Sequence, residues 1–587
     1  MAKKEKKVTA EKEHDKLQPL RKALAENKWG QAVRIGGAFR DTALWEGTCL
    51  IVGKKIIELD QAGDIDALQT LYHFMDKNIS LKKTGDGKFI WLTQIVRTCD
   101  DRLKFVAEYK VARIARDFLR SLPEDAHPAP LIKRDVYFYY ALASFRMGEI
   151  AESVDGFNEV WQMDERLEIR AKTFSNLLFS AQNLNFADED LFAMHCVFNK
   201  LFAEVKPYEY DFTALKAQLK ERMANGGKIR VGYISPDFRE HVVIKFVCGL
   251  FEFYDKDKFD IFAYSLAHIP PDDVTQWIAE RCCKFTNIAK MNTNDAARFI
   301  HEDKLDILVD FAGHTANNPL PILAYKPAPI IVTGVGYMST TGLKAVDYII
   351  SDKIVEPPEE GGKYLTEKPL YLTSHFSYSF YRNDPPACQG TPCVKKGYVT
   401  FGSFNKYNKF TDEMLSAWRD IMNQVEGSRL LLKSFGFDED DFRTLLKERL
   451  ERLNFDLSRV DIEGSSQDYM LRYFDVDIAL DTYPYTGGTT TCDALYMGVP
   501  VVSQYGARRN TRFGLGILAN MGLKSLTTEN SEDYVAFAVK LAKDTELLDG
   551  LHKNLRNIFL RSPVGDARHY AEEMQKKYVE ILGLSVL

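Results

Sequence analysis

The sequence predicts an all-α domain followed by two Rossmann-like α/β domains that face each other across a cleft. Residues 17–222 show apolar side chains at helical spacing. Residues 228–385 alternate short apolar strands with helical stretches, and residues 395–540 repeat this alternation after a linker rich in proline and glycine. Near-continuous apolar strands are typical of buried parallel sheets. Two such series therefore indicate two doubly wound sheets.

Size and composition are typical of a multidomain globular protein. The 587 residues exceed the span of one ordinary core, and 45% hydrophobic with 27% charged residues is usual for folded domains. A net charge of −6 gives no support to nucleic acid as a partner. No apolar run reaches the roughly 20 residues of a membrane span. The nine cysteines form no CxxC pair, so we expect reduced thiols and a cytoplasmic protein.

The ends of the chain predict a tail and two helical regions. Residues 1–16 carry lysines without an apolar segment, so we expect a disordered tail and no signal peptide. Within the all-α domain of residues 17–222, the stretch 135–165 resembles one degenerate tetratricopeptide helix pair, and no regular repeat follows it. We expect this domain to select an acceptor or partner protein. Residues 541–587 predict C-terminal helices.

Residues 476–505 form the most informative stretch, a predicted strand–turn–helix–strand unit. Its loop lies at the carboxyl end of a parallel strand, where open α/β sheets bind ligands. Gly488 allows a close backbone approach, and Thr489 and Thr490 place N–H groups and hydroxyls at a helix N-terminus, which suits a phosphate. Asp493 follows about one turn later, where its carboxylate can hold a ribose diol. For this stretch alone, an ordinary glycine-capped connection is the alternative.

Two other loops of the 395–540 series carry candidate ligand-binding groups. Asn405 and Lys409 follow a predicted strand, and a lysine beside helix-bound phosphates suits a departing diphosphate. Tyr469 and Arg472 are three residues apart on one helix face, where they can stack on and hydrogen-bond a base. A surface lysine is the alternative for Lys409, and an exposed pair is the alternative for Tyr469 and Arg472.

The 228–385 series places polar groups at the same edge of its own sheet. His241 follows the first strand and the turn that contains Asp237, so it can transfer or orient a proton at the cleft. A merely exposed histidine is the alternative. Asp310 lies inside an apolar strand, where a carboxylate is costly unless bonded, so we expect it to hold a loop N–H or His314. We place Asp237 and His314 on the sugar and acceptor side of the cleft.

Asp475 and Asp477 match the DxD metal motif of some glycosyltransferases. They run into a strand whose residues alternate between faces, and no cluster of histidine and carboxylate residues supports them. We therefore expect neither a metal nor another cofactor.

Six ordered motifs resemble the catalytic region of the O-GlcNAc transferase family. They are VGYISPDFREH, DILVDFAGHT, KPAPIIVTGVGYMSTTGLKAVDYIISD, VTFGSFNKYNKF, GSRLLLKS and LDTYPYTGGTTTCDALYMGVPVV. This family also holds bacterial homologues, plant O-fucosyltransferases and soluble bacterial asparagine N-glycosyltransferases. The resemblance covers roughly residues 170–540. It implies a GT-B fold, a nucleotide-sugar substrate, inversion at the anomeric carbon, no metal, and a C-terminal helix that packs back on the first Rossmann-like domain.

By motif, the resemblance assigns roles to individual residues. Lys409 matches the family's pyrophosphate-contacting lysine, Thr489 and Thr490 match its phosphate-loop threonines, and Asp493 matches its ribose carboxylate. Arg472 falls where the family reads the base.

Three further positions can be compared with the family motifs. His241 matches a histidine that has been assigned either as a base or to the acceptor site. Gly488 stands where animal members carry histidine, and His314 stands where they carry tyrosine. These departures and the compact helical domain leave the sugar and the acceptor open.

The sequence thus predicts a metal-independent protein glycosyltransferase that transfers GlcNAc or a similar sugar from a UDP-sugar to Ser or Thr. We assign Lys409 and His241 to catalysis, with positioning and charge stabilisation as the protein's main contribution. One alternative is an asparagine N-glucosyltransferase that uses UDP-glucose. An alternative of another class is a non-catalytic scaffold that binds a nucleotide sugar.

Overall fold

The computed structural model describes residues 16–40, 42–78, 86–360, 362–380, 385–388 and 390–584. The chain divides into two compact units, residues 1–165 with 439–442, and residues 166–438 with 443–587. Residue 16 is helical, and the rest of the tail predicted for residues 1–16 lies outside the described residues. No helix in the described part of the chain combines the length and apolar content needed to cross a membrane.

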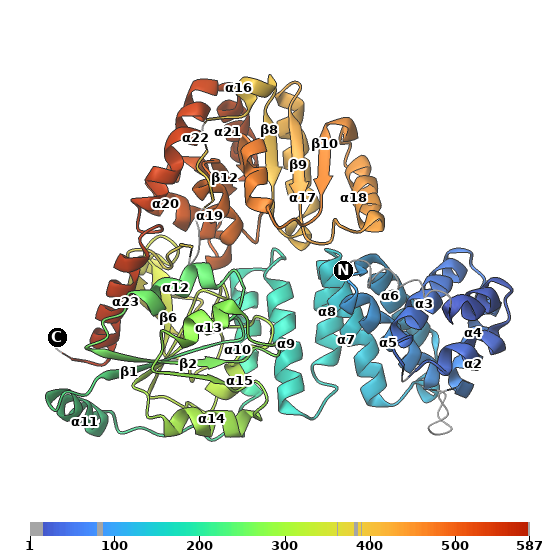
Figure 1. Cartoon of the computed structure of the whole chain (residues 1–587), viewed down its shortest axis with the longest axis horizontal. Helices are drawn as coiled ribbons and strands as arrows, with labels where there is room; N and C mark the ends of the chain where they lie inside the picture. Colours follow the sequence, from blue (N-terminus) through green and yellow to red (C-terminus); the bar gives the residue numbers. More distant parts are fainter. Residues whose placement is uncertain are drawn as a thin grey trace, which may run out of the picture. The chain divides into compact units, whose positions relative to one another are not determined.

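The first unit is built from helices (Figure 1). After helical residues 16–25, they are α2 (Trp29–Gly37), α3 (Trp45–Gln61), α4 (Ile65–Asn78), α5 (Gly87–Asp101), α6 (Phe105–Ser121), the 3₁₀ turn η1 (Glu124–Ala126), α7 (Pro130–Arg146) and α8 (Ile150–Val160). α2 packs on α4, α3 on α5, and α5 on α7. This stacking is typical of tetratricopeptide-like repeats, of which the sequence indicated only the last pair.

That last pair shows why small residues lie at the helix contact. Gly148 makes the turn between α7 and α8 with a φ of +76°, which glycine adopts without strain. A Cβ atom on Gly156 would lie 2.8 Å from Ala141 Cβ, so only glycine lets the two helices approach this closely. Phe157 is 1% exposed and fills the space beside this contact.

The second unit begins with α9 (Leu167–Ala181), α10 (Asp188–Lys200) and α11 (Phe212–Ala224). The domain predicted for residues 17–222 is therefore divided at residue 165. α9 and α10 pack on the first α/β domain because their polar side chains bond to its core. Gln182 on the C-cap of α9 donates to Tyr337 Oη at 3.2 Å, and Tyr337 Oη also lies 2.8 Å from His195 Nε2 of α10.

The first α/β domain holds a seven-stranded parallel sheet in the order β3-β2-β1-β4-β5-β6-β7. Its strands are β1 (Ile229–Ser235), β2 (Phe259–Ser265), β3 (Lys284–Asn287), β4 (Ile307–Asp310), β5 (Ile330–Thr333), β6 (Tyr348–Asp352) and β7 (Lys368–Leu372), and its helices are α12 (Ile244–Glu252), α13 (Asp273–Ala279), α14 (Thr293–Glu302) and α15 (Leu320–Leu323). Strand order reverses between β1 and β4, so a crevice is expected at their carboxyl ends.

The second α/β domain holds a six-stranded parallel sheet in the order β10-β9-β8-β11-β12-β13. Its strands are β8 (Thr400–Ser403), β9 (Arg429–Lys433), β10 (Val460–Glu463), β11 (Ile478–Leu480), β12 (Val501–Gln504) and β13 (Thr527–Thr528). The helices are α16 (Cys393–Lys396), α17 (Asp412–Gln424), α18 (Asp440–Arg452), α19 (Thr489–Tyr496), α20 (Phe513–Asn520), α21 (Ser531–Lys543) and α22 (Thr545–Leu560). The order reverses between β8 and β11, whose loops carry the candidate site.

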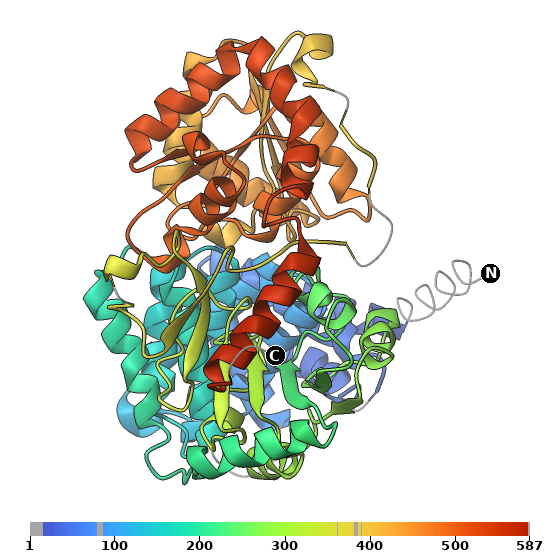
Figure 2. The same cartoon turned by 90° about the vertical axis from the view of Figure 1, so that its left-hand side faces the viewer.

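The last helix, α23 (Ala567–Ile581), returns to the first α/β domain. Figure 2 shows it in red, running down across the first sheet, where it packs on α12 and β7. A Cβ atom on Gly249 of α12 would lie 2.8 Å from the Ala567 carbonyl oxygen, so the close contact requires glycine. Tyr578 Oη bonds to Tyr233 Oη of β1 at 3.4 Å. The C-terminal helix implied by the family resemblance is confirmed.

Candidate active site

The loop between β11 and α19 is shaped by a buried carboxylate. Asp481 follows the strand directly and accepts the N–H groups of Thr482 at 2.8 Å and Gly487 at 2.7 Å, together with the Ser503 hydroxyl at 2.7 Å. Burial raises the pKa of Asp481, and these three donors act against that shift. Asp481 therefore holds the turn that leads into α19, a supporting role that the sequence did not reveal.

The N-terminus of α19 faces outward from this turn. Gly488 is its N-cap and makes no side-chain cap, and Thr489 and Thr490 after it are half-buried. Thr490 Oγ1 donates to Asn405 Oδ1 at 3.0 Å, which joins the two predicted loops of this domain. A Cβ atom on Gly488 would lie 3.1 Å from Met338 Cε of the first α/β domain. The helix N-terminus thus lies next to the first α/β domain, and a helix N-terminus suits an anion such as phosphate.

Lys409 lies beside this helix N-terminus. Its Nζ donates to the Thr486 carbonyl oxygen at 2.9 Å and lies 4.3 Å from the centroid of the Tyr485 ring. Burial lowers the pKa of Lys409 to about 7, against the attraction of Asp481. A phosphate placed here would favour the charged ammonium form and raise this pKa again. The protonation of Lys409 is therefore expected to depend on whether an anionic ligand is bound.

Asp493 is held by groups from both domains. It is 2% exposed and accepts hydrogen bonds from Lys245 Nζ at 2.9 Å, from Tyr469 Oη at 2.9 Å and from the Tyr378 hydroxyl. Burial lowers the pKa of Lys245, but the Asp493 carboxylate and Tyr469 together outweigh that effect, so the pKa lies above its ordinary value. A carboxylate offers about four lone-pair positions, so Asp493 keeps limited capacity for a ribose diol.

Sequence reasoning missed Lys245 and Tyr378. Lys245 lies four residues after His241, on the first turn of α12. A lysine inside the otherwise apolar stretch VVIKFVCGLF was a signal, because a buried ammonium needs a carboxylate partner. Tyr378 lies in the connection after β7 and gave no comparable signal.

The predicted base-reading pair has divided roles. Tyr469, in the 3₁₀ segment η5 (Tyr469–Asp475), bonds to Lys245 Nζ at 3.0 Å as well as to Asp493, so it belongs to the site. Arg472 directs its guanidinium to Glu463, with an Nη2–Oε1 distance of 2.6 Å, and to Asp475. Tyr469 therefore lies with the other candidate residues, whereas the guanidinium of Arg472 is paired with two neighbouring carboxylates.

At the carboxyl end of β1, two titratable groups have opposite pKa shifts. His241 Nδ1 lies 3.5 Å from Asp237 Oδ1. Burial lowers the pKa of His241 to about 4, assisted by the cations of Arg239 and Lys406, while burial raises the pKa of Asp237 to about 6. Lys406 comes from the second α/β domain, and its charge acts on both groups. The Lys406 cation of the β8 loop therefore lies within electrostatic range of the β1 loop.

His314 does not lie at the cleft where we expected it. Its side chain is 1% exposed, with Nδ1 2.9 Å from Ser175 Oγ of α9 and Nε2 2.8 Å from the Thr341 carbonyl oxygen. Burial holds the pKa of His314 well below its usual range. Because both ring nitrogens bond within the interior, the histidine fastens α9 to the first sheet.

Asp310 has the supporting role that we expected. Its carboxylate accepts the N–H groups of Ala312 at 2.8 Å and Gly313 at 2.9 Å, and the Thr333 hydroxyl at 2.8 Å. The expected loop N–H bonds are confirmed, and they shape the loop that carries His314.

The DxD carboxylates serve the second sheet. Asp477 is buried and accepts the N–H groups of Cys393 and Thr400, each at 2.7 Å. Asp475 pairs with Lys396 at 2.8 Å and with Arg472. Both side chains are thus bonded within the domain, and the described residues contain no group of three or more histidine, cysteine or carboxylate side chains arranged to hold a metal.

Comparison with known proteins places this geometry in a family. Residues 194–383 and 393–574 match glycosyl transferase family 41, and this span includes both sheets and all the loops described above. The chain belongs to glycosyl transferase family 41. The resemblance to O-GlcNAc transferases, and with it the expectation of a glycosyltransferase, is confirmed at the level of the family.

Plant proteins are among the curated relatives of this chain. The probable UDP-N-acetylglucosamine–peptide N-acetylglucosaminyltransferase SPINDLY of Arabidopsis thaliana is 36% identical over 390 residues, which cover 65% of this chain and 42% of that protein. The SPINDLY protein of Hordeum vulgare is 36% identical over 355 residues, 59% of this chain and 37% of that protein. This chain thus spans less than half the length of these relatives.

A solved structure matches nearly the whole chain. The O-GlcNAc transferase of Thermobaculum terrenum, solved as a mutant, superimposes with a TM-score of 0.72 at 21% identity and covers 97% of this chain and 98% of that one. Identity this low shows the fold alone. The predicted GT-B fold, with helices before its two Rossmann-like domains, is confirmed.

Proposed function

We propose that this chain is an inverting glycosyltransferase that moves GlcNAc or a related sugar from a UDP-sugar to Ser or Thr residues of proteins. The observation that carries the proposal is the position of Lys409 beside the free N-terminus of α19. Its Nζ bonds to the Thr486 carbonyl, two residues before the N-cap Gly488. The names of the plant relatives support a UDP-GlcNAc donor and a peptide acceptor.

The chemical step needs stabilisation of the departing diphosphate. The acceptor oxygen forms a bond to the anomeric carbon as the bond to the diphosphate breaks. The hydroxyl proton passes to solvent or to the departing diphosphate, and negative charge grows on the β-phosphate. We assign the stabilisation of that charge to the N–H groups of Thr489 and Thr490 at the helix N-terminus and to the Lys409 ammonium beside it. Preorganised donors of this kind contribute most when they need no rearrangement during the reaction. The mechanism assigns no step to a metal.

The acceptor side of the cleft is assigned to the β1 loop. His241 and Asp237 lie near each other, and the Lys406 charge from the other domain acts on both. A His241 pKa of about 4 leaves the ring neutral at pH 7, so it can accept a hydrogen bond from an acceptor hydroxyl. In this proposal His241 orients the acceptor, and Asn405 keeps Thr490 in place.

The helical unit and the cellular location follow from the same proposal. The stacked helices α2–α8 carry no nucleotide-binding motif, and helix stacks of this type offer extended surfaces to protein partners. We assign acceptor selection to this unit.

All nine cysteines are free thiols, which supports a reducing compartment such as the cytoplasm.

Intact-mass spectrometry of candidate acceptor proteins, incubated with the full chain and UDP-GlcNAc, tests the proposal. We expect a mass increase of one sugar residue, sited on Ser or Thr by fragmentation and unaffected by EDTA. Parallel reactions with UDP-glucose and other UDP-sugars identify the donor. Modification sited on asparagine would replace the proposed acceptor, and UDP binding without transfer to any acceptor would favour a non-catalytic scaffold.

A further inference from the structure

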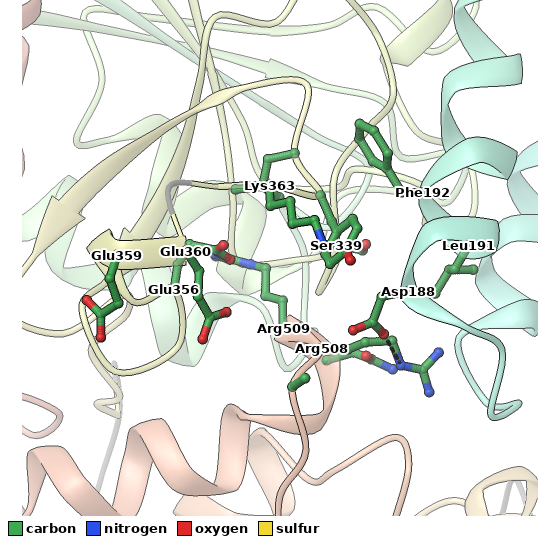
Figure 3. Close-up of a pocket in the computed structure, with 14 residues that line it drawn as sticks. Asp188, Leu191, Phe192, Ser339, Glu356, Glu359, Glu360, Lys363, Arg508 and Arg509 are labelled. Carbon is green, nitrogen blue, oxygen red and sulfur yellow. Dashed lines mark ion pairs between the residues drawn. The ribbon is translucent and has the colours of Figure 1, made fainter.

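A cavity lies in the second unit, outside the site described above. It is bounded by the N-terminal half of α10, the loop after β6 and residues 507–510 after β12, and it encloses about 390 Å³ (Figure 3). Small-molecule sites in proteins usually measure roughly 300–1,000 Å³. Three segments far apart in the sequence thus form a space of ligand size.

The charges around this cavity nearly balance. Three cationic side chains, among them Arg508 and Arg509, face four carboxylates, and Figure 3 shows Asp188 and Arg508 side by side as an ion pair. A ligand with a net charge would meet several charges of its own sign, whichever sign it carried. The lining therefore favours an uncharged ligand that both donates and accepts hydrogen bonds.

Both arginines are more than nine-tenths buried and incompletely bonded. Arg508, 8% exposed in its side chain, lies 3.5 Å from Asp188 and donates through Nη2 to the Leu184 carbonyl at 3.0 Å, whereas its Nη1 has no partner among the described residues. Arg509, 7% exposed, donates through Nη1 to Ser351 Oγ at 2.8 Å, and its Nε likewise lacks a partner within the described part of the chain. Both unbonded nitrogen atoms are themselves buried, so the two arginines form the wall of the cavity without offering these N–H groups to a ligand.

One wall of the cavity is apolar. Phe192 of α10 and Tyr364 of the β6–β7 loop place their ring centroids 6.1 Å apart at 60°, and Leu191 and Leu365 lie next to them. A sugar ring has one face of C–H groups and an edge of hydroxyls, and each hydroxyl is both a donor and an acceptor. These properties match an aromatic wall together with the carboxylates of the lining and the Lys363 ammonium.

We propose that this cavity binds a saccharide. Its hydroxyls accept hydrogen bonds from the Lys363 ammonium and donate to the carboxylates of Asp188 and Glu356, and its C–H face packs on Phe192. The saccharide is either free or attached to a glycoprotein. The chemistry at the cavity is the same for both sources.

Residues of both α/β domains connect the cavity to the loop between β11 and α19. Asn510, which lines it, accepts the Thr486 hydroxyl through its carbonyl at 3.1 Å, and Thr486 in turn accepts from Lys409. Ser339, also in the lining, follows Met338, the residue that faces Gly488. A bound saccharide would thus lie one loop away from the phosphate-binding residues, without sharing a residue with them.

Saturation-transfer NMR on the full chain tests this inference. With UDP present in excess to occupy the donor site, N-acetylglucosamine, glucose and a GlcNAc-bearing glycopeptide are titrated, with the unglycosylated peptide as reference. We expect saturable binding that Ala507→Trp weakens at least tenfold, because the indole fills the rim of the cavity and removes no arginine contact. The matched control is Ala203→Trp, an exposed alanine outside the lining, which should bind like the parent chain.

The outcomes separate the alternatives. Binding of free sugars identifies a free saccharide as sufficient, and binding of the glycopeptide alone identifies an attached one. Absence of binding by all three probes, or equal binding by the Ala507→Trp variant, would overturn the inference. Saccharide binding that persists in a chain that fails to bind UDP would count against the proposed donor and leave the cavity's assignment intact.

Discussion

At the scale of single residues, Lys409 is the most direct test of the proposed chemistry. Lys409→Ala removes the cation beside the helix N-terminus, so turnover should fall roughly 10²–10³-fold, as for other single electrostatic stabilisers. The fold should persist, because the side chain makes one hydrogen bond, to Thr486. Steady-state kinetics measure the effect, with Lys540→Ala at an exposed lysine of the same domain as control. Activity close to that of the parent chain would remove Lys409 from the mechanism.

The lowered pKa of Lys409 also predicts how UDP affinity depends on pH. Burial lowers its pKa from 10.5 to about 7, so the free lysine loses its proton as the pH rises above 7. A diphosphate favours the charged form, so UDP binding takes up a proton above pH 7, and affinity falls by up to about tenfold per pH unit. Calorimetry in buffers of different ionisation enthalpy measures the uptake, which Lys409→Gln should abolish. A dissociation constant that stays flat from pH 7 to 9 would contradict this assignment.

Asp493 and Lys245 form a coupled pair, so single substitutions have two effects. Asp493→Asn should weaken UDP binding about 10- to 150-fold, equivalent to losing a charged hydrogen bond of about 1.5–3 kcal/mol. It should also destabilise the fold, because Lys245 is left buried without a carboxylate. Adding Lys245→Met should restore the melting temperature without restoring UDP affinity. Full recovery of UDP binding in the double variant would show that Asp493 does not hold the ribose.

At the scale of elements, the turn into α19 depends on the absence of a side chain at one of its two glycines. A Cβ atom on Gly487 would lie 2.6 Å from the hydroxyl oxygens of Thr490 and Thr491, whereas one on Gly488 would meet only the flexible end of Met338. Gly487→Ala should therefore cost about 1–3 kcal/mol by overpacking and lower UDP affinity. Gly488→Ala is the matched control and should change both little. Thermal melts and UDP titrations compare the two, and equal effects would contradict this account of the loop.

At the scale of the whole molecule, the division at residue 165 decides where the chain can be cut. α9 and α10 bury His314 and Tyr337 of the first α/β domain, so a fragment that begins near Gly227 exposes this apolar surface and should aggregate. A fragment that begins at Arg166 should be soluble and bind UDP like the full chain, but fail to modify the protein acceptor. Size-exclusion chromatography, UDP calorimetry and intact-mass assays test this. Full transfer by the shorter chain would contradict acceptor selection by α2–α8.

The sequence by itself determined the layout of the α/β part and most of the donor loop. Apolar runs that alternate with helical stretches are local patterns, and each reports whether a segment is buried on one face or two. The loop residues Asn405, Lys409, Thr489 and Thr490 could be placed because they follow strands whose carboxyl ends must meet at one edge of a parallel sheet. The motifs that resemble the family lie in these same loops.

Only the tertiary structure decided the pairings between distant residues. Lys245 and Asp493 are 248 positions apart, and no local pattern says which carboxylate a buried lysine meets. His314 and His241 each follow a strand of the first sheet. Helix α9 covers His314, whereas His241 is half-exposed. The boundary at residue 165 could not be predicted from the sequence either, because the helices on both sides of it have the same periodicity. Which surface covers a helix or a loop depends on packing across the whole unit, and a one-dimensional pattern does not carry that information.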